Sequence, residues 1–173
     1  MFKVLTLIFL GLGAFASNLN VVKGEIKAHT EVFGDSKIDP STKQIKADLT
    51  IDDSIESIKG KVYFETLSLI SETKDRDSHM YELLNEPKYK TISFTISNVK
   101  KTEENYEING TLTLNGVSKP VVAKTIINQE NNSVALSGGF SINLTDYEMK
   151  PPKLLFLTVR NQIDISYNIE LKK

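Results

Sequence analysis

The chain has no cysteine and no tryptophan, and only two of its 173 residues are histidine. Without cysteine it can form no disulfide and has no thiolate chemistry, and this absence is compatible with either redox compartment. The absence of tryptophan weakens a hypothesis of sugar binding by aromatic stacking. Zinc sites draw mainly on histidine and cysteine. We therefore expect no metal centre and no cofactor.

Strong charge and the common catalytic motifs are absent too. A formal net charge of -1 is too neutral for a nucleic-acid binder, which normally carries a basic stripe. The sequence has no Gly-x-Ser-x-Gly elbow and no glycine-rich phosphate loop. The acidic pairs Asp52-Asp53 and Glu103-Glu104 lie in turn-like segments and are interpreted as solvated surface. These omissions favour a non-catalytic protein that does not bind nucleic acid, and they leave an enzyme acting on lipid-linked substrates as a third hypothesis.

One apolar run stands out, and it lies at the N-terminus. Met1-Phe2-Lys3 is a positive leader, an apolar stretch runs from Val4 to Phe15, and Ala14-Phe15-Ala16 is a small-x-small site. This order predicts a secretory signal peptide over residues 1–16, cleaved after Ala16, and a single mature domain over residues 17–173. The alternative is an uncleaved anchor, but the run is shorter than the roughly 20 residues a span needs.

The rest of the chain alternates apolar and polar residues. Between Leu157 and Leu171 nearly every odd position is apolar and every even one polar, which indicates a strand with one dry and one wet face. Short connections such as Asn115-Gly116 favour tight antiparallel hairpins. Segments of this kind begin at the apolar or aromatic residues Val22, Ile45, Ile58, Ile92, Tyr106, Val121, Val134 and Leu157.

About eight antiparallel strands with no intervening helices predict an all-β fold. A closed barrel is favoured over a sandwich, because closure removes exposed strand edges. A barrel of this size either fills its interior with side chains or holds one small ligand. Gly24, Gly60, Gly110 and Gly138 fall on the interior face, where we expect them to leave space.

One segment departs from the alternation. Between Thr73 and Leu84, the residues Met80, Leu83 and Leu84 have helical spacing, and Pro87 follows. Asp75 or Asp77 is expected to cap the start of a short helix near one end of the barrel. A metal site formed by His79 with these two carboxylates is the less favoured interpretation.

Two motifs carry a family resemblance. The segment Gly110–Val121, GTLTLNGVSKPV, resembles the G-x-L-T-(I/L)-x-G-V-(T/S)-K-P-V segment of the YceI-like periplasmic polyisoprenoid-binding proteins, and Arg76–Met80 is similar to that family's R-D-x-H-L segment. The resemblance extends over residues 17–173. It implies a periplasmic, lipocalin-like barrel that binds an isoprenoid or a similar fatty-chain amphiphile and has no catalytic residues. The chain departs from the family in lacking the usual N-terminal tryptophan and in the segment Leu144–Glu148.

The predicted ligand-binding residues form two groups. Apolar interior positions are expected to contact the tail, and polar residues at the mouth are expected to bind the headgroup. An alternative role for Arg76 and Asp77 is to join the helix to the barrel rim. The tail group comprises Ile26, Phe64, Phe94, Leu112, Leu114, Phe140, Ile142 and Val159, and the mouth group comprises Arg76, Asp77 and His79.

The first hypothesis is thus a periplasmic carrier that holds a long-chain amphiphile in an apolar channel without turnover. The second is an interaction or stress-protective module whose barrel is plugged by its own side chains, with Phe64, Phe94, Phe140 and Phe156 meeting in the middle. A homodimer formed through an exposed edge or the loop around Pro151-Pro152 is a further hypothesis, which the sequence does not test.

Overall fold

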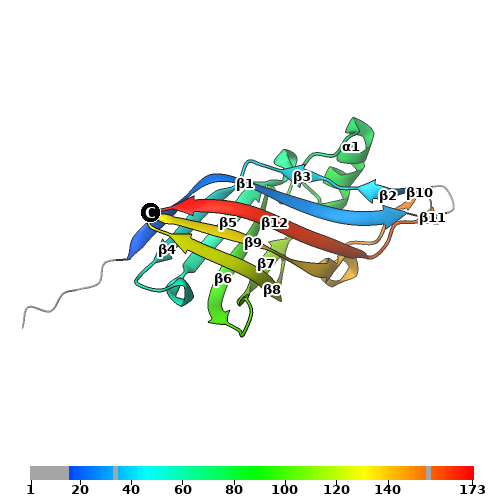
Figure 1. The fold of residues 1–173 in the computed structure, drawn as a ribbon. Coiled ribbons are helices and arrows are strands. Elements are labelled where there is room, and N and C mark those ends of the chain that lie inside the picture. The colour runs from blue at the N-terminus through cyan, green and yellow to red at the C-terminus, as the bar shows by residue number, and fades with distance from the viewer. Residues whose placement is uncertain (1–15, 33–34, 155–156) are drawn as a thin grey trace, which may run out of the picture.

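Eight strands of the chain close into an antiparallel barrel, as the alternation predicts. The structure, a computed structural model, describes residues 16–32, 35–154 and 157–173. The strands follow the order β12-β9-β8-β7-β6-β5-β4-β1, and pairing of β1 with β12 closes the barrel (Figure 1). Their bounds are β1 (Ser17–Val32), β4 (Lys46–Ile51), β5 (Lys59–Glu65), β6 (Thr91–Lys101), β7 (Tyr106–Leu114), β8 (Val117–Glu130), β9 (Ser133–Asn143) and β12 (Gln162–Lys172).

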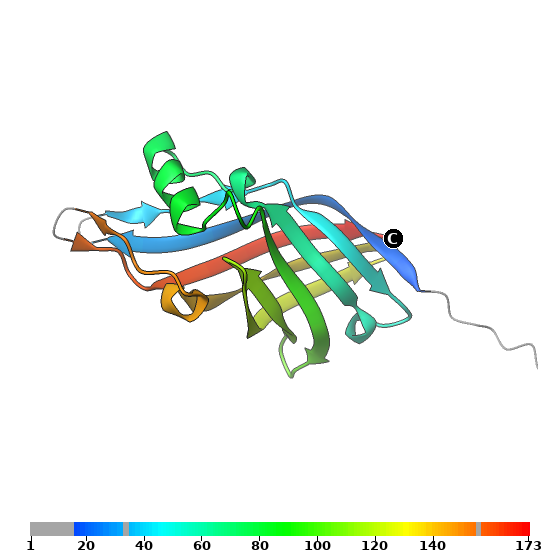
Figure 2. The same cartoon turned by 180° about the vertical axis from the view of Figure 1, so that it is seen from behind.

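Short elements gather at one end of the barrel. There β1 pairs with β2 (Asp35–Ile38) and β3 (Ser41–Thr42), while β10 (Lys153–Leu154) pairs with β11 (Leu157–Thr158). The helix α1 (Lys74–Leu83) lies on the same half of the molecule (Figure 2). We call this the α1 end. Single 3-10 turns complete the chain: η1 (Ile55–Ser57), η2 (Thr66–Ser68) and η3 (Leu144–Tyr147).

The tight turn between β7 and β8 has the geometry that its sequence predicts. Asn115 and Gly116 both have positive φ, 51° and 73°, as a two-residue hairpin turn requires. The C-terminal strand is shorter than expected, because the chain turns between β11 and β12. The Val159 N–H donates to Pro152 O at 3.0 Å and the Arg160 N–H donates to Glu31 O at 2.9 Å, so β12 begins only at Gln162.

A bulge in β1 changes which residues face inward near its start. The register with β12 shifts between Val21 and Lys23, so that Val21 pairs with Leu171 and Gly24 with Ile169. Val22, which the alternation places on the interior face, is therefore 55% exposed. A bulge inserts one unpaired residue and reverses the alternation, and nothing in this local pattern signals it.

The start of α1 also differs from the sequence-based expectation. Thr73 occupies the N-cap position and makes no side-chain capping bond, while Asp75 and Asp77 lie in the first turn. The Asp77 carboxylate instead accepts a hydrogen bond from the Ser71 N–H at 2.7 Å. The helix ends at Leu83, and the positive φ of Asn85 turns the chain before Pro87 is reached.

The interior contains two clusters of buried hydrophobic side chains. We call the cluster farther from α1 the first cluster; its members include Leu19, Leu49, Val134 and Leu171. The second cluster lies at the α1 end and includes Leu84 of the segment after α1 and Tyr147 of η3. Within the part of the chain that the structure describes, no helix is long and apolar enough to cross a membrane. The predicted signal peptide lies outside the described residues except for Ala16.

Candidate functional site

Three of the predicted tail-contact residues lie between the two clusters. Ile26, Phe94 and Phe140 pack against both clusters, and all three remain partly exposed. The Phe94 and Phe140 rings stack with centroids 6.0 Å apart and planes 26° from parallel. Because Phe94 is on β6 and Phe140 on β9, which are not neighbours in the sheet, this pair spans the barrel interior.

Four further predicted residues are fully packed. Phe64, Leu112, Leu114 and Ile142 belong to the second cluster, and each is between 5% and 7% exposed. They form the wall of the α1 end. Val159 is buried as well, but it lies in the connection between β11 and β12 and belongs to neither cluster.

The structure adds residues that the sequence reasoning did not select. Val121, Ile163 and Ile165 pack against the second cluster and stay partly exposed, as do Met80 and Leu83 of α1. The alternation of β12 was a usable signal for the two isoleucines, whereas both faces of β8 near Val121 are apolar. An inward-facing side chain that retains solvent exposure borders space that the protein does not fill. We call Ile26, Phe94, Val121, Phe140, Ile163 and Ile165 the apolar belt.

Two interior glycines do not leave the open space expected of them. A Cβ on Gly110 would collide with the Phe94 ring, which lies over this position, and a Cβ on Gly138 would lie 2.9 Å from Tyr167 Oη. The glycines therefore make room for neighbouring aromatic side chains. At Gly24 an added Cβ would lie 3.0 Å from Cδ1 of the aliphatic Ile45, and Gly60 has a φ of +119° beside the Asp48 carbonyl.

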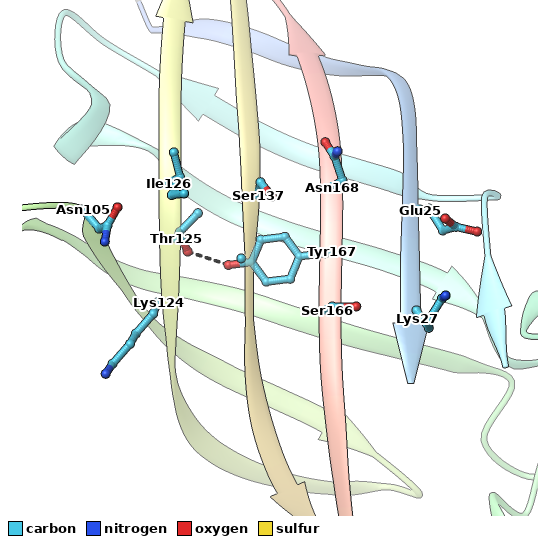
Figure 3. A pocket seen from close by; sticks show the side chains of 11 residues that line it. Glu25, Lys27, Asn105, Lys124, Thr125, Ile126, Ser137, Ser166, Tyr167 and Asn168 are labelled. Carbon is cyan, nitrogen blue, oxygen red and sulfur yellow. Dashed lines mark hydrogen bonds between the residues drawn. The ribbon is translucent and has the colours of Figure 1, made fainter. Parts of the chain in front are cut away.

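The side chain of Tyr167 on β12 extends over Gly138 of β9 and reaches β8. Gly138 pairs with Tyr167 on β12 and with Thr125 on β8, so the three residues form one row across the sheet. Tyr167 Oη and Thr125 Oγ1 are 2.5 Å apart and hydrogen-bonded (Figure 3). Thr125 is 1% exposed, so this bond provides a partner for a polar group buried beside the first cluster. Burial also raises the pKa of Tyr167.

The three predicted headgroup residues lie on α1 in different surroundings. Arg76 and Asp77 are partly buried, and Arg76 is four residues before Met80, on the helix face that packs against the barrel. Asp77 accepts the Ser71 N–H, which favours its role in joining the helix to the preceding loop. His79 is exposed, although it lies three residues after Arg76 and four before Leu83, which packs against the second cluster. The three side chains therefore differ in burial and in their partners.

A charged network lies on the outer surface at the α1 end. His29 Nδ1 is 2.5 Å from Asp39 Oδ1, and His29 Nε2 is 3.3 Å from Glu31 Oε1. Arg160 is bonded to Asp164 at 2.5 Å and lies 3.6 Å from Glu31. The hydrogen bond that His29 donates to Asp39, followed by the one it donates to Glu31, raises the pKa of His29. These contacts connect β1, the segment before β3, and β12.

Hydrogen bonds also lower the pKa of the Asp164 carboxyl group in this network. Ser141 Oγ donates to Asp164 Oδ1 at 2.6 Å and Gln162 Nε2 donates at 2.7 Å. Together with Arg160 they lower the pKa of Asp164 to about 2. Among the described residues, no group of three or more histidine, cysteine or acidic side chains is arranged to hold a metal ion.

A groove of about 560 Å³ lies on the outer face of the barrel (Figure 3). Its outward side chains come from β1, β12, β9, β8 and the turn between β6 and β7, and most are polar. An apolar tail gains little from such a surface, because its transfer from water depends on apolar burial. The groove is lined by Glu25, Lys27, Asn105, Lys124, Thr125, Ile126, Ser137, Gly138, Ser166, Tyr167 and Asn168.

Comparison with known proteins identifies the fold and the family. The profile of the YceI-like domain matches residues 18–171. A UPF0312 protein of Pseudomonas savastanoi pv. phaseolicola is 32% identical over 127 residues, which cover 68% of this chain and 65% of that protein. Protein YceI of Escherichia coli is 36% identical over 100 residues, covering 53% and 52%. The matched region therefore spans between half and two thirds of the length of these relatives.

Solved structures share the barrel at low sequence identity. Burkholderia cenocepacia BcnA superposes with a TM-score of 0.75 at 13% identity, covering 85% of this chain and 95% of that one. A mutant of a Campylobacter jejuni YCEI protein gives 0.69 at 22%, covering 80% and 86%. A polyisoprenoid binding domain from Saccharophagus degradans gives 0.66 at 10%, covering 89% and 97%. At these identities the likeness establishes the fold.

Proposed function

Since the chain belongs to the YceI-like domain family, we propose that it is a periplasmic carrier that binds the tail of an isoprenoid or other long-chain amphiphile inside its barrel, without turnover. The apolar belt is the observation that carries this proposal. Its six side chains remain partly exposed; Ile26, Phe94 and Phe140 pack against both clusters, and the other three pack against the second cluster only. A bound tail would cover them.

The apolar belt is suited to a hydrocarbon tail, because a tail can be bound without precisely placed polar groups. Each buried methylene contributes about 0.8 kcal/mol, so about ten of them contribute roughly 8 kcal/mol. Association costs at least about 4 kcal/mol in lost freedom of motion. A long chain is therefore needed for tight binding. The similar barrel from Saccharophagus degradans is described as a polyisoprenoid binding domain, which is consistent with this ligand class.

The second candidate function, a plugged barrel, is favoured by one contact. The stacked Phe94 and Phe140 rings span the interior, as that hypothesis expects of two of its four phenylalanines. Phe64 instead lies in the packed second cluster, and Phe156 is outside the described residues. In the carrier proposal this ring pair is the inner limit of the tail site at the α1 end. The two functions differ in whether the purified protein contains a lipid.

Export to the periplasm is part of the proposal. The N-terminal sequence supports it, and β1 begins at Ser17, directly after the predicted cleavage site. N-terminal sequencing of the protein recovered from a periplasmic fraction tests it, with Ser17 as the expected first residue. A homodimer remains a prediction, which the mass in solution would test.

The experiment that tests the carrier function is organic extraction of protein purified from its native periplasm, followed by mass spectrometry. We expect a stoichiometric long-chain amphiphile in the extract. The matched control is an extract of the same protein after unfolding, delipidation and refolding, which should be empty. Recovery of no lipid from the native material would favour the plugged barrel.

A further inference from the structure

The barrel wall is incomplete between two of its strands. Pairing between β8 and β9 runs from Lys124↔Gly139 to Glu130↔Ser133. The first half of β8, from Val117 to Ala123, pairs only with β7 among the described residues. The facing residues of β9, from Phe140 to Asn143, pair only with β12. Beyond this point β9 continues into η3, whereas β8 turns back into β7 (Figure 2).

The sequence of β8 explains why this ladder stops. Pro120 lies in the half of β8 that does not pair with β9. Proline has no N–H to donate, so in sheets it is restricted to edges and bulges. At the far end the gap is bridged by one contact, in which Asn115 Nδ2 donates to Tyr147 O at 3.0 Å. The result is a break of bounded length in the backbone pairing of the barrel wall, which we call the β8–β9 opening.

The inner rim of the opening is apolar. Val117 and Val121 of β8 pack against the second cluster and keep partial exposure. Across from them Phe140 is partly exposed as well, and Ile142 is buried. Val121 and Phe140 both belong to the apolar belt, so the opening is continuous with the proposed tail site.

One cation shares this face of β8. Lys119 pairs with Leu112, and paired residues of antiparallel strands point to the same side of the sheet. Leu112 is a buried interior residue, yet Lys119 is exposed, because the sheet beside it is open. Lys119 makes no ion pair or hydrogen bond with any residue that the structure describes. Its ammonium group is therefore available to an anion.

A buried hydroxyl without a partner lies in the cluster behind the opening. Tyr147 is 1% exposed, and its Oη makes no hydrogen bond within the described part of the chain. Burial of such a group without a partner is unfavourable. The Oδ1 atom of the neighbouring Asn115 is buried and unpartnered too. A ligand oxygen reaching this point would satisfy the phenol.

We propose that the β8–β9 opening is the lateral entrance of the tail site and that Lys119 and the Tyr147 hydroxyl bind an anionic headgroup there, a phosphate or a carboxylate. The inference rests on the carrier function proposed above and specifies the headgroup end of the same site. It replaces the helix residues Arg76, Asp77 and His79 as the principal headgroup contacts.

The headgroup part is tested with three probes: farnesol, farnesyl phosphate and hexadecanoate. Their dissociation constants are measured for the wild type, for Lys119→Gln and for Lys124→Gln. Lys124 is the matched control, because it lies on the same strand and points outward. We expect Lys119→Gln to weaken the anionic probes about five- to tenfold and to leave farnesol unchanged, with no effect of Lys124→Gln.

The outcomes separate this inference from the carrier function. If the wild type binds farnesol but Lys119→Gln binds both anions as well as the wild type does, the headgroup site is wrong and the carrier function stands. If the wild type binds none of the probes, both fail. Weakening of farnesyl phosphate alone assigns a phosphate, and weakening of hexadecanoate alone assigns a carboxylate; either result supports the proposal.

Tyr147→Phe provides an independent readout. It removes the unsatisfied hydroxyl, so the ligand-free protein should unfold at the same or a higher temperature than the wild type. The same variant should bind farnesyl phosphate several-fold more weakly. Lower stability of the ligand-free protein together with unchanged binding would contradict the role of the phenol.

The entrance itself is tested with single tryptophans, since the chain has none of its own. A tryptophan at Val117 borders the opening, and one at Val122, which is 52% exposed on the outer face of the same strand, is the control. We expect 9,10-dibromostearate to quench Val117→Trp at saturation and to leave Val122→Trp bright. Equal quenching of the two tryptophans would contradict a lateral entrance at this opening. So would unquenched fluorescence of Val117→Trp in protein that has bound the bromolipid.

Discussion

At the scale of single residues, buried polar atoms are the features that sequence patterns describe least well. Thr125 and Tyr167 occupy interior positions of the alternation, where a hydroxyl is tolerated only with a partner. The structure supplies that partner across Gly138. Nothing in the local sequence of either strand indicates the other residue, since they are 42 positions apart.

The Tyr167–Thr125 bond predicts unequal effects of removing its two hydroxyls. Tyr167→Phe should lower the free energy of unfolding by about 1 kcal/mol, the net value of a hydrogen bond. Thr125→Val should cost more, about 1–3 kcal/mol, because it leaves the partly buried phenol of Tyr167 without this partner, whereas in Tyr167→Phe the Thr125 hydroxyl keeps its hydrogen bond to Ala123 O. Urea denaturation of both variants and of the double variant measures the coupling, and strict additivity of the two effects would contradict a direct bond.

His29 makes a pH-dependent contribution of defined sign. Asp39 and Glu31 raise its pKa above the ordinary value of 6.5 in the folded state. The network therefore stabilises the fold fully below pH of about 6.5 and loses this contribution as pH rises through the folded pKa. An NMR titration should give a His29 pKa above 6.5 that falls in Asp39→Asn, and an unchanged value in that variant would argue against the contact.

At the scale of elements, the edges of the predicted segments were wrong more often than the segments themselves. The alternation located all eight barrel strands, because period-2 patterning follows directly from burial of one sheet face. The bulge after Val21 and the turn after Thr158 were missed. Both depend on hydrogen bonds to distant strands, which a local pattern does not contain.

The first turn of α1 offers a matched pair of carboxylates. Asp75 and Asp77 both benefit from the helix N-terminus, but only Asp77 accepts the Ser71 N–H. Asp77→Ala should therefore lower the free energy of unfolding by about 1 kcal/mol more than Asp75→Ala. Thermal or urea unfolding of the two variants measures the difference; equal losses would show that charge alone matters there.

Substitution of Gly110 in β7 is expected to destabilise the fold, because there is no space for a side chain at this position. The Phe94 ring occupies the volume that a methyl group would need. Gly110→Ala should lower the free energy of unfolding by about 1–3 kcal/mol, in the range of overpacked interiors. Adding Phe94→Leu to Gly110→Ala should recover part of the loss. Chemical denaturation measures the free energy of unfolding of each variant. An unchanged value in Gly110→Ala would show that the Phe94 ring is free to move.

At the scale of the whole molecule, the sequence predicted a closed barrel with one short helix, and the structure has that fold. The candidate site was predicted less completely. Three of the eight tail residues lie in the apolar belt, since only a three-dimensional arrangement separates interior residues that pack against one another from those that border free space. The β8–β9 opening depends on where two strands part, and Pro120 was its one local sign.

The belt makes a prediction about loading. Phe94→Arg places a charge in the apolar interior, whose burial without a partner is costly, so the tail should be excluded while the barrel still folds. Thr95→Arg is the matched control, because Thr95 is the exposed neighbour on the outer face of β6. Ile165→Trp is a second test that adds bulk to the belt without charge and should also reduce loading. Circular dichroism checks that each variant folds.

Binding of a tail inside the barrel is tested most directly by the molar amount of extractable lipid per protein, measured by mass spectrometry on the wild type and these three variants purified from the same expression host. We expect lipid in the wild type and in Thr95→Arg, and little or no lipid in Phe94→Arg and Ile165→Trp. Equal lipid content in all four folded proteins would contradict it, because the tail would then lie outside the barrel interior.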